Sequence, residues 1–567
     1  MNNSEVHRDY RPNVNIEDVR LSEHGVSLNK RRIAWNKLHR DLTSHQRGYL
    51  GFQANQNLDC DRIKPFFDMA INNFGDPFSA SGLNGTNTIV MERAVLEYFA
   101  KLWGIIRPSQ PSNGDKLWRT RQSYPSNEEE RAYWGYVTTM GCTEGNMYAF
   151  YTARDYLAGM PLTDPNLLQD ISGESGTEIN ETYRTLVPNH VPSADVCTKR
   201  NLAANPNNFT PVVFISEESY HGNLKALHML QMKTFREIGS GHFPCPLEFP
   251  YDYPTCFNGE NLDKNGWPRA VPVDEVGAMN IPCLVKLVTP FLFRGYPPLI
   301  VFTSGTTFRG AYDNPKAAID KLVPILKEHN MYERPVQSSV SPTKFDVRSG
   351  FWFHIDGASG GGQLAFLEMA MNQGLVEDSF PDGFPLFDFR IPEVKSIATS
   401  LHKWFGCPFP AALFMMRKMD QVKPFENPSF IGGNDSTVSG SRNGHSVLVL
   451  WDLLSRKSYN DLVEIVVREE AMVTFSLGKF RDLERDLKLD LWLLHSPGSL
   501  FILFKQPRQD IVRRYSLASK ALNVKTPDGE FERRIYSRIC LMPHVTADLI
   551  LQLIEELRTP SAFPNQQ

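Results

Sequence analysis

The sequence predicts an α/β protein with a mostly parallel, helix-covered sheet and a smaller C-terminal α+β lobe. Five apolar runs of strand length support the sheet, at 211–216, 283–288, 298–304, 351–356 and 411–417. Several of these runs are continuously apolar rather than alternating, which is typical of strands buried on both faces of a sheet. Helix-like segments lie between and beside them, and this alternation favours parallel strands.

Two helices have clear sequence signals. One begins near Glu144 and runs through "EGNMYAFYTARDYLAG". The other, "NPKAAIDKLVPILKEHN", opens with Asn314 as N-cap and Pro315 at the first helical position, where the missing N–H of proline is not needed. Asp313 directly precedes them, and this place favours interpreting it as a capping residue rather than as a ligand-binding carboxylate.

The pattern changes after about residue 420. Helical and strand-like runs follow one another at 446–487, 499–505, 508–522, 535–543 and 546–558. Their alternation predicts a separate lobe with antiparallel strands. We therefore divide the chain into an N-terminal segment, a large α/β domain and a small α+β domain, at residues 1–105, 106–420 and 421–567. Polar stretches are interpreted as surface insertions, at 106–130, 160–210, 238–275 and 331–349.

Composition limits the possible partners. The chain has 567 residues, of which 41% are hydrophobic and 22% charged, and its net charge is −4. The length is too great for one ordinary core, and the slight negative charge argues against nucleic acids and anionic membranes as partners. The eight cysteines form no C-x-x-C pair, and no signal-peptide core or membrane-length apolar run is visible. These features predict a cytoplasmic protein, and we expect no metal site.

The stretch "ATSLHKWFGCPFPAALFMMR" (398–417) places Lys403 among mostly apolar neighbours, after a β-like run and before a Gly/Pro turn. A lysine in such surroundings has its charged form disfavoured and its amine made more nucleophilic. Those are the conditions for a lysine that bonds covalently to an aldehyde. A solvated surface lysine is the alternative.

The stretch "TTMGCTEGNMYAF" (138–150) is a turn of small residues that runs into a helix. Backbone N–H groups at a helix N-terminus can bind a phosphate, and Gly141 permits a close approach. Cys142 and Thr143 would add N–H and hydroxyl donors. An ordinary helix start, with Thr143 as N-cap, remains open.

In "FWFHIDGASGGG" (351–362), Asp356 ends an apolar strand and is followed by small residues. A carboxylate buried there needs a positive or proton-donating partner, which a protonated pyridine nitrogen would provide. The alternative is a capping aspartate at a strand-to-loop exit.

Three further stretches are weaker. "ISEESYHGNLKAL" (215–227) offers the aromatic rings of Tyr220 and His221, one of which could lie flat on a conjugated ring. "GTTFRGAYDN" (305–314) offers the hydroxyl of Thr306, and "DSTVSGSRNGHS" (435–446) combines hydroxyls with Arg442. Each stretch, taken alone, is explained at least as well as an ordinary loop, and for 435–446 the loop interpretation is favoured.

These features in this order fit a single ligand that has a phosphate, an aromatic ring with a basic nitrogen, and an aldehyde. That ligand is pyridoxal 5'-phosphate. The chain resembles the group II pyridoxal-phosphate decarboxylases of amino acids, and among them the histidine-decarboxylase-like branch. The resemblance spans about 45 to 555 and includes "GYLGFQANQN", "INNFGDPFSASG", "MGCTEGN", "SGTTFRGAYDN", "HIDGASGGG", "TSLHKWFGCPFP", "STVSGSRNGH" and "LMPHVT".

The resemblance implies an aspartate-aminotransferase-like fold, the fold type I of pyridoxal-phosphate enzymes. It also implies a homodimer with shared active sites, in which residues 1–105 wrap the partner subunit. Lys403 would bind the aldehyde of the cofactor and Asp356 its ring nitrogen. Further contacts to ring or phosphate are implied for Gly141, Cys142, Thr143, Tyr220, Thr306, Ala358, Ser400, His402, Ser441 and Arg442. The 435–442 loop would approach the phosphate of the other subunit.

Two positions depart from the family pattern. Ser219-Tyr220-His221-Gly222 stands where the family usually has Ser-His-Tyr-Ser, so Tyr220 takes the ring-stacking position and His221 can have exchanged roles with it. Phe430 stands where related enzymes have a mobile-loop tyrosine that delivers a proton to Cα. Loss of that tyrosine can let oxygen intercept the reaction, which then yields an aldehyde, ammonia and hydrogen peroxide.

The sequence therefore predicts decarboxylation of an L-amino acid, with histidine or another aromatic amino acid favoured, to the amine and CO₂. Oxidative deamination to the aldehyde is one alternative, and a catalytically silent cofactor-binding protein is another. An aminotransferase would need an arginine for the substrate carboxylate, and the sequence identifies none. The substrate pocket is expected to involve residues 49–57 and 72–79, where Leu50 replaces a common proline.

Overall fold

The computed structural model describes residues 14–79, 85–106, 132–163, 169–170, 210–337, 344–424, 435–559 and 561–563. The chain divides into a larger unit, residues 59–466, and a smaller unit made of residues 1–58 and 467–567. The limits of these units differ from the predicted boundaries at 105 and 420. Residues 59–105 and 421–466 belong to the larger unit because short strands and helices from the two segments pair and pack with each other.

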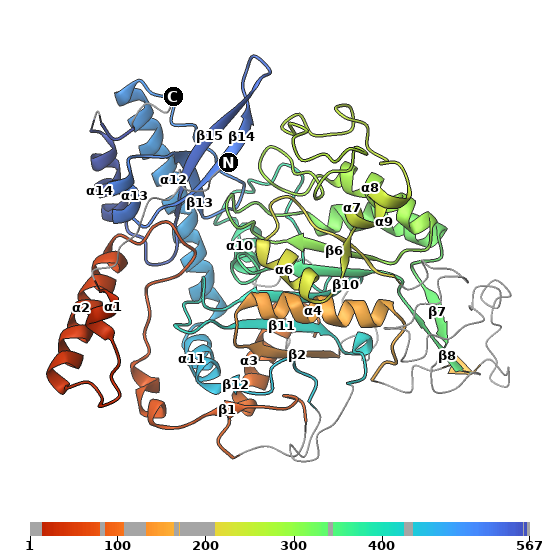
Figure 1. Cartoon of the computed structure of the whole chain (residues 1–567), viewed down its shortest axis with the longest axis horizontal. Coiled ribbons are helices and arrows are strands. Elements are labelled where there is room, and N and C mark those ends of the chain that lie inside the picture. Colours follow the sequence, from red (N-terminus) through yellow and green to blue (C-terminus); the bar gives the residue numbers. More distant parts are fainter. Residues whose placement is uncertain are drawn as a thin grey trace. The chain divides into compact units, whose positions relative to one another are not determined.

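A seven-stranded sheet lies at the centre of the larger unit, in the order β2–β11–β10–β9–β6–β4–β5. Figure 1 shows β10, β11 and β2 side by side in this sheet. Only β11 runs antiparallel to its neighbours, so the sheet is mostly parallel, as predicted. Its strands are β2 (Tyr133–Thr138), β4 (Val212–Phe214), β5 (Lys233–Thr234), β6 (Pro298–Thr303), β9 (Trp352–Asp356), β10 (Val394–Ser400) and β11 (Ala412–Arg417).

Helices cover both faces of this sheet. Gly135 of β2 faces Leu96 of α3 (Ile89–Leu102), whereas the next residue, Tyr136, packs against Tyr148 of α4 (Cys142–Leu157). Successive residues of a strand point to opposite faces, so α3 and α4 lie on opposite sides. The other helices of this unit are η2 (Asp61–Asp68), α6 (His221–Met229), α7 (Phe235–His242), α8 (Ile281–Phe293), α9 (Pro315–Glu328), α10 (Gln363–Asn372), η6 (Lys418–Asp420) and α11 (Gly444–Ser455).

Within the described ranges, the larger unit also contains two smaller sheets. The strands β1 (Asn72–Asn73) and β12 (Arg442–Asn443) form an antiparallel pair. The second sheet has the order β3–β8–β7, with β3 (Gln169–Asp170), β7 (Arg334–Gln337) and β8 (Lys344–Arg348). The predicted insertions at 106–130 and 160–210 lie mostly outside the described residues, whereas much of 331–349 forms the β7–β8 hairpin.

Four of the five predicted strand runs contain strands, namely β4, β6, β9 and β11. The prediction for 283–288 is wrong, because this run lies inside α8. The side chain of Asn280 accepts a hydrogen bond from the Cys283 N–H and caps the helix. The buried residues of α8 recur at helical spacing, at 283, 284, 287, 288, 291 and 292. A window of six residues was too short to show this period.

The two helices with clear signals are present as α4 and α9. Asn314 is the N-cap of α9, where its side chain accepts from the Ala317 N–H. The capping interpretation of Asp313 is wrong. Its buried carboxylate accepts hydrogen bonds from the backbone N–H groups of Met279 and Thr303, and so joins a loop to the end of β6.

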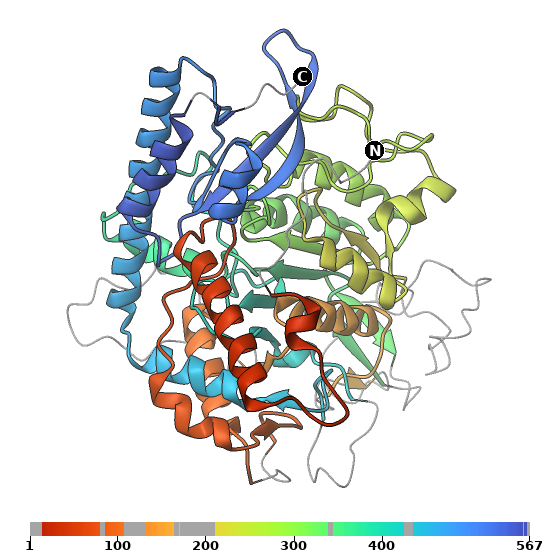
Figure 2. The same cartoon turned by 60° about the vertical axis from the view of Figure 1, so that its left-hand side comes forward.

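The smaller unit contains α1 (Ile16–Val19), α2 (Leu28–Arg47), α13 (Gln509–Arg514), α14 (Ala547–Leu557) and most of α12 (Tyr459–Leu487). The helix α12 has 29 residues and is the long light-blue helix in Figure 2. Its antiparallel sheet has the order β13–β15–β14, with β13 (Phe501–Lys505), β14 (Ala518–Lys525) and β15 (Phe531–Cys540). The helix predicted over 508–522 ends at Arg514, because the residues that follow pair with β15. No helix in the described ranges is long and apolar enough to cross a membrane.

Candidate active site

Most of the predicted cofactor residues lie at the carboxyl ends of the parallel strands. Asp356 is the last residue of β9 and Ser400 the last residue of β10. Tyr220 and Thr306 lie in the loops that follow β4 and β6. Ligands of open α/β sheets bind at this edge, because loops from neighbouring strands meet there.

The turn before α4 has the shape that a phosphate site requires. Gly141 is the N-cap of α4 and has a φ of +68°, a conformation that favours glycine. A Cβ at this position would lie 3.0 Å from Cε1 of His402, so the glycine also allows the histidine to approach. The first N–H groups of a helix have no partner within it and can bind an anion. Cys142 is buried in this turn and Thr143 is exposed.

Glu144, which the sequence did not identify as a site residue, fixes the conformation of this turn. Its Oε2 accepts hydrogen bonds from the N–H groups of Thr139, at 2.8 Å, and Met140, at 2.9 Å. Its Oε1 accepts from the hydroxyl of Ser439 at 2.9 Å. The carboxylate thus connects the phosphate turn to the 435–442 loop, which sequence reasoning had placed near a phosphate.

Asp356 is buried and accepts several hydrogen bonds. Its Oδ2 accepts from Nδ2 of Asn223 at 2.9 Å, and its Oδ1 from the backbone N–H of Ala358 at 3.2 Å. The thiol of Cys142 lies 3.9 Å from Oδ1. Burial raises the pKa of this thiol well above its ordinary value, the Asp356 carboxylate raises it further, and the charge of Lys403 lowers it. The structure therefore brings Cys142, Asp356 and Lys403 together.

Lys403 follows β10 in a turn with buried aromatic neighbours. Trp404 and Phe405 are both buried, and Trp404 stacks on Phe366 of α10 with ring centroids 5.9 Å apart. His402 is anchored by Nδ1, which lies 2.8 Å from the carbonyl oxygen of Ala411. Burial lowers the pKa of His402, while the bond to Ala411 acts in the opposite sense.

Tyr220 and His221 differ in exposure. Tyr220 is half-buried and His221 is exposed, with ring centroids 4.3 Å apart. The ring of Tyr220 lies against Gly222, where a Cβ would approach its Cε1 to 2.4 Å. Only a glycine at 222 leaves room for this position of the tyrosine. Phe430, the other departure from the family pattern, lies outside the described residues.

Thr306 is fully buried in the turn after β6. Its hydroxyl oxygen accepts from the Ala311 N–H at 3.0 Å, and its own N–H donates to the Ala311 carbonyl at 2.7 Å. The hydroxyl hydrogen can still donate to a neighbouring group. That Thr306 lies beside the ring of the cofactor stays a prediction.

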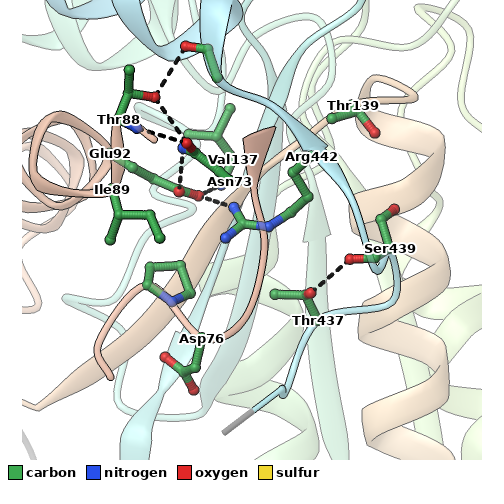
Figure 3. Close-up of polar contacts among 12 residues, drawn as sticks. Asn73, Asp76, Thr88, Ile89, Glu92, Val137, Thr139, Thr437, Ser439 and Arg442 are labelled. Atoms are coloured by element: carbon green, nitrogen blue, oxygen red, sulfur yellow. Dashed lines mark hydrogen bonds and ion pairs between the residues drawn. The ribbon is translucent and has the colours of Figure 1, made fainter. Parts of the chain in front are cut away.

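Arg442 takes part in a different set of contacts from the predicted one. Figure 3 shows its guanidinium directed toward Glu92 of α3, with which it forms a fully buried ion pair. A second N–H donates to the carbonyl oxygen of Gly75 at 3.0 Å. Ser441 is exposed, and its hydroxyl oxygen accepts from Nδ2 of Asn72 at 3.0 Å. In the larger unit Arg442 thus balances a buried carboxylate, and its contact with a partner's phosphate stays a prediction.

Sequence reasoning missed three further buried residues, Asn146, Asn223 and His354. Asn223 donates to Asp356, Asn146 donates to Asn223, and His354 lies within hydrogen-bonding distance of Asn146. All three stand in stretches that had been singled out, namely "MGCTEGN", "SYHGN" and "FHID". The signal was present in the motifs, but only the fold shows that these polar side chains meet.

The residues present fit pyridoxal phosphate. At the turn of Gly141 no side chain caps α4, and the first N–H groups of the helix can therefore bind an anion. The Asp356 carboxylate has acceptor capacity beyond the contacts described, which suits a protonated ring nitrogen. Lys403 supplies an amine in the same neighbourhood. Together these groups match the phosphate, the ring nitrogen and the aldehyde of the cofactor.

Comparison with known proteins agrees with this chemistry. The pyridoxal-dependent decarboxylase conserved domain matches residues 267–446. Serine decarboxylase 2 of Oryza sativa subsp. japonica is 24% identical over 90% of this chain and 75% of its own length. Histidine decarboxylase of Vibrio anguillarum is 22% identical over 90% of this chain and 89% of its own.

A solved structure gives the stronger similarity. L-Methionine decarboxylase from Streptomyces sp. 590, in complex with L-methionine methyl ester, is 32% identical to this chain, with a TM-score of 0.79. The match covers 97% of this chain and 98% of the other. These relatives are carboxy-lyases that use pyridoxal phosphate, and their fold is the predicted fold type I. The chain therefore belongs to the group II pyridoxal-phosphate-dependent amino acid decarboxylases.

Proposed function

We propose that this enzyme converts an L-amino acid with an uncharged side chain to the corresponding amine and CO₂, and that L-methionine is the first substrate to test. The similarity to L-methionine decarboxylase over nearly the whole of both chains carries this proposal. The relatives that act on serine and histidine are less similar, at 24% and 22% identity. Histidine or another aromatic amino acid, which the sequence favoured, remains the competing choice.

When bound, pyridoxal phosphate supplies an aldehyde for amino groups and a ring that accepts the electron pair released as CO₂ leaves. Lys403 would hold the cofactor through its Nζ, and the apolar turn around it favours the nucleophilic amine. Asp356 would keep a proton on the ring nitrogen. Contacts to developing charge of this kind typically contribute about 3–4 kcal/mol to transition-state stabilisation.

The remaining residues would bind and orient the cofactor. The turn at Gly141, held by Glu144, would take the phosphate. Tyr220, supported by Gly222, would cover one face of the ring, opposite Ala358. The half-buried position of Tyr220 and the exposure of His221 support this assignment of the two side chains.

One incubation tests the proposed function. Purified holoenzyme is supplied with a panel of twenty amino acids, with and without oxygen, and amine, CO₂, aldehyde and peroxide are quantified together. We expect amine and CO₂ in equal amounts, with L-methionine or another uncharged substrate, regardless of oxygen. A Lys403→Ala protein serves as the control and should lose turnover. Turnover confined to acidic or basic amino acids would contradict the proposal.

The same incubation tests the alternative reaction. If Phe430 replaces the tyrosine that delivers a proton to Cα, one O₂ and one water are consumed for each aldehyde, CO₂, ammonia and hydrogen peroxide formed. Aldehyde and peroxide that appear only in air would therefore establish oxidative deamination. A Phe430→Tyr variant should then shift the product toward the amine.

A further inference from the structure

A continuous line of buried polar side chains leads from the sheet to Asp356. The line crosses β9, β10, α4 and α6, and each member is at most 1% exposed. Its members, in order, are Trp352, Ser396, His354, Asn146, Asn223 and Asp356. Buried polar groups are costly unless all of their hydrogen bonds are made. We therefore expect the hydrogen bonds of this line to run in one direction, so that each side chain accepts from one neighbour and donates to the other.

Every link of this line has hydrogen-bonding distance. Nε1 of Trp352 lies 2.9 Å from Oγ of Ser396, and Nδ1 of His354 lies 2.8 Å from the same oxygen. Nε2 of His354 lies 3.0 Å from Oδ1 of Asn146. Nδ2 of Asn146 lies 3.0 Å from Oδ1 of Asn223, whose Nδ2 lies 2.9 Å from Oδ2 of Asp356.

An ionised Asp356 allows only one direction. A carboxylate can only accept, so Asn223 must turn its NH₂ group to Asp356 and its oxygen to Asn146. The second hydrogen of this NH₂ group is donated to Oγ of Ser219, which lies 3.1 Å from Nδ2 of Asn223. Asn146 must then donate to Asn223 and present its own oxygen to His354. Nε2 of His354 must therefore carry a hydrogen.

The far end of the line agrees with this direction. An indole N–H can only donate, so Ser396 accepts from Trp352 and gives its own hydrogen to Nδ1 of His354. Burial lowers the pKa of His354 to about 4, against the opposing effect of the Asp356 carboxylate, so the imidazole is neutral at pH 7. A neutral imidazole has one donor and one acceptor, which is what the two neighbours require.

With a proton on Oδ2, Asp356 would instead donate to the oxygen of Asn223, both amides would turn over, and His354 would carry its hydrogen on Nδ1 and donate to Ser396. Only the bond from Trp352 to Ser396 would keep its direction, because an indole N–H can only donate. The ionisation of Asp356 and the tautomer of His354 are thus coupled through two amides. The other titratable groups near this carboxylate are Cys142 from α4, Asp313 from the loop after β6, and Lys403.

We propose that Asn223, Asn146 and His354 are positioning residues, which hold Asp356 in its ionised, accepting form before the cofactor binds. This inference rests on the proposed function, because it assigns the line to the ring nitrogen of pyridoxal phosphate. Hydrogen bonds to a carboxylate favour its charged form. The line therefore prepares the one group that keeps the ring nitrogen protonated.

The first test uses the protein without its cofactor. In protein labelled with ¹⁵N-histidine, two-bond ¹⁵N–¹H correlations identify which ring nitrogen of His354 carries the hydrogen, and a His354→Gln protein assigns the signal. We expect the Nε2–H tautomer at pH 7. The Nδ1–H tautomer, or a charged imidazole, would overturn the proposal while leaving the proposed function intact.

The second test measures the ring nitrogen directly. Holoenzyme is prepared with pyridoxal 5'-phosphate labelled with ¹⁵N in the ring, and the ¹⁵N shift is followed with pH. In Asn223→Leu the ring nitrogen should lose its proton at a pH about one unit lower than in the parent. His354→Leu should give a smaller shift, and His354→Gln, which keeps a donor toward Asn146, should approach the parent.

A matched control separates positioning from general loss of packing. Ser349→Ala removes another buried hydroxyl of the larger unit, bonded to Tyr156 and Phe351, and should leave the ring nitrogen unchanged. If Asn223→Leu fails to fold, the ring-nitrogen titrations of the two His354 variants test the proposal. Equal ring-nitrogen titration in His354→Leu, His354→Gln and parent would overturn the proposal. A parent that neither binds the cofactor nor turns over any amino acid would overturn the proposed function together with this inference.

Discussion

At the scale of single residues, the shape of the site depends on how closely neighbours approach. Tyr220 occupies its half-buried position because Gly222 has no side chain. Gly141 plays a similar part for His402. In both places an aromatic ring lies where a Cβ would otherwise be, so the glycine and the ring form one structural unit.

The pairing of Tyr220 with Gly222 gives a prediction for cofactor affinity. In Gly222→Ala the new Cβ would approach the tyrosine ring to 2.4 Å, so the ring must move. A stacked aromatic pair contributes about 0.5–1.5 kcal/mol. We therefore expect the Kd for pyridoxal phosphate, measured by fluorescence titration of the apoenzyme, to rise roughly three- to tenfold.

The control for this prediction is Gly241→Ala in α7, where a Cβ would meet nothing within 4 Å. Its affinity for the cofactor should equal that of the parent. An unchanged Kd in Gly222→Ala would show that Tyr220 does not cover the ring.

At the scale of secondary-structure elements, the Glu92–Arg442 pair joins α3 to β12, and Glu92 also contacts β1 and β2. Glu92 also accepts from the N–H of Val137 at 2.8 Å and from Nδ2 of Asn73 at 3.1 Å. The backbone of β12 pairs with β1 in the same place. Four elements from three parts of the chain, namely β1 and α3, β2, and β12, therefore depend on one buried carboxylate and its cation.

Removal of one partner should destabilise the larger unit. Arg442→Met leaves the carboxylate of Glu92 buried without its cation, which typically costs about 3–5 kcal/mol. We expect a decrease of this size in the free energy of unfolding of the apoenzyme, measured with urea. The double variant Glu92→Leu/Arg442→Leu should recover most of it, because neither charge is then buried alone.

Arg456→Met is the matched control, because it removes an exposed ion pair with Asp59 and should change stability little. If Arg442 instead served mainly to bind a phosphate, Arg442→Met would weaken cofactor binding and leave the unfolding of the apoenzyme unchanged.

At the scale of the whole molecule, the predicted homodimer needs a surface that a partner can cover. The helix α2 has four exposed apolar residues on one face, namely Leu28, Trp35, Leu38 and Leu42, whereas the exposed Ile33 lies on roughly the opposite side. Their spacing of seven, three and four residues keeps them on one side of the helix. A partner subunit that covered this face would remove it from water.

Charges on this face should therefore separate the subunits. We expect Trp35→Glu/Leu42→Glu to shift the sedimenting species from two chains of 64.5 kDa toward one, because burying a carboxylate in an apolar contact is costly. If the active sites are shared, activity should fall with the dimer fraction. Arg40→Glu, on roughly the opposite side of α2, should leave the mass unchanged. A dimer that persists with both glutamates on α2 would contradict the prediction that a partner subunit covers the apolar face of this helix.

Local patterns in the sequence determined much of the fold and the main chemical groups. Continuous apolar runs indicated β4, β6, β9 and β11, because buried strands need apolar side chains. Capping residues indicated α9, because the first N–H groups of a helix need hydrogen-bond acceptors. Lys403 and Asp356 could be selected because one stands just after a strand and the other ends a strand, both among neighbours unsuited to a charge. The same local reasoning failed for 283–288 and for 515–522, where a short window does not separate helix from strand.

Only the tertiary structure decided which polar side chains meet. Arg442 and Glu92 are 350 residues apart, and Asn223 and Asp356 are 133 apart. Their contacts depend on strand order and register, which no local period encodes. The sequence by itself thus determined the kinds of groups that we propose to bind pyridoxal phosphate. The tertiary structure decided that Arg442 balances the buried Glu92, and that Asn223, Asn146 and His354 form a hydrogen-bonded line to Asp356. The physical reason is that hydrogen bonds between distant segments form only once the sheet has brought these segments together.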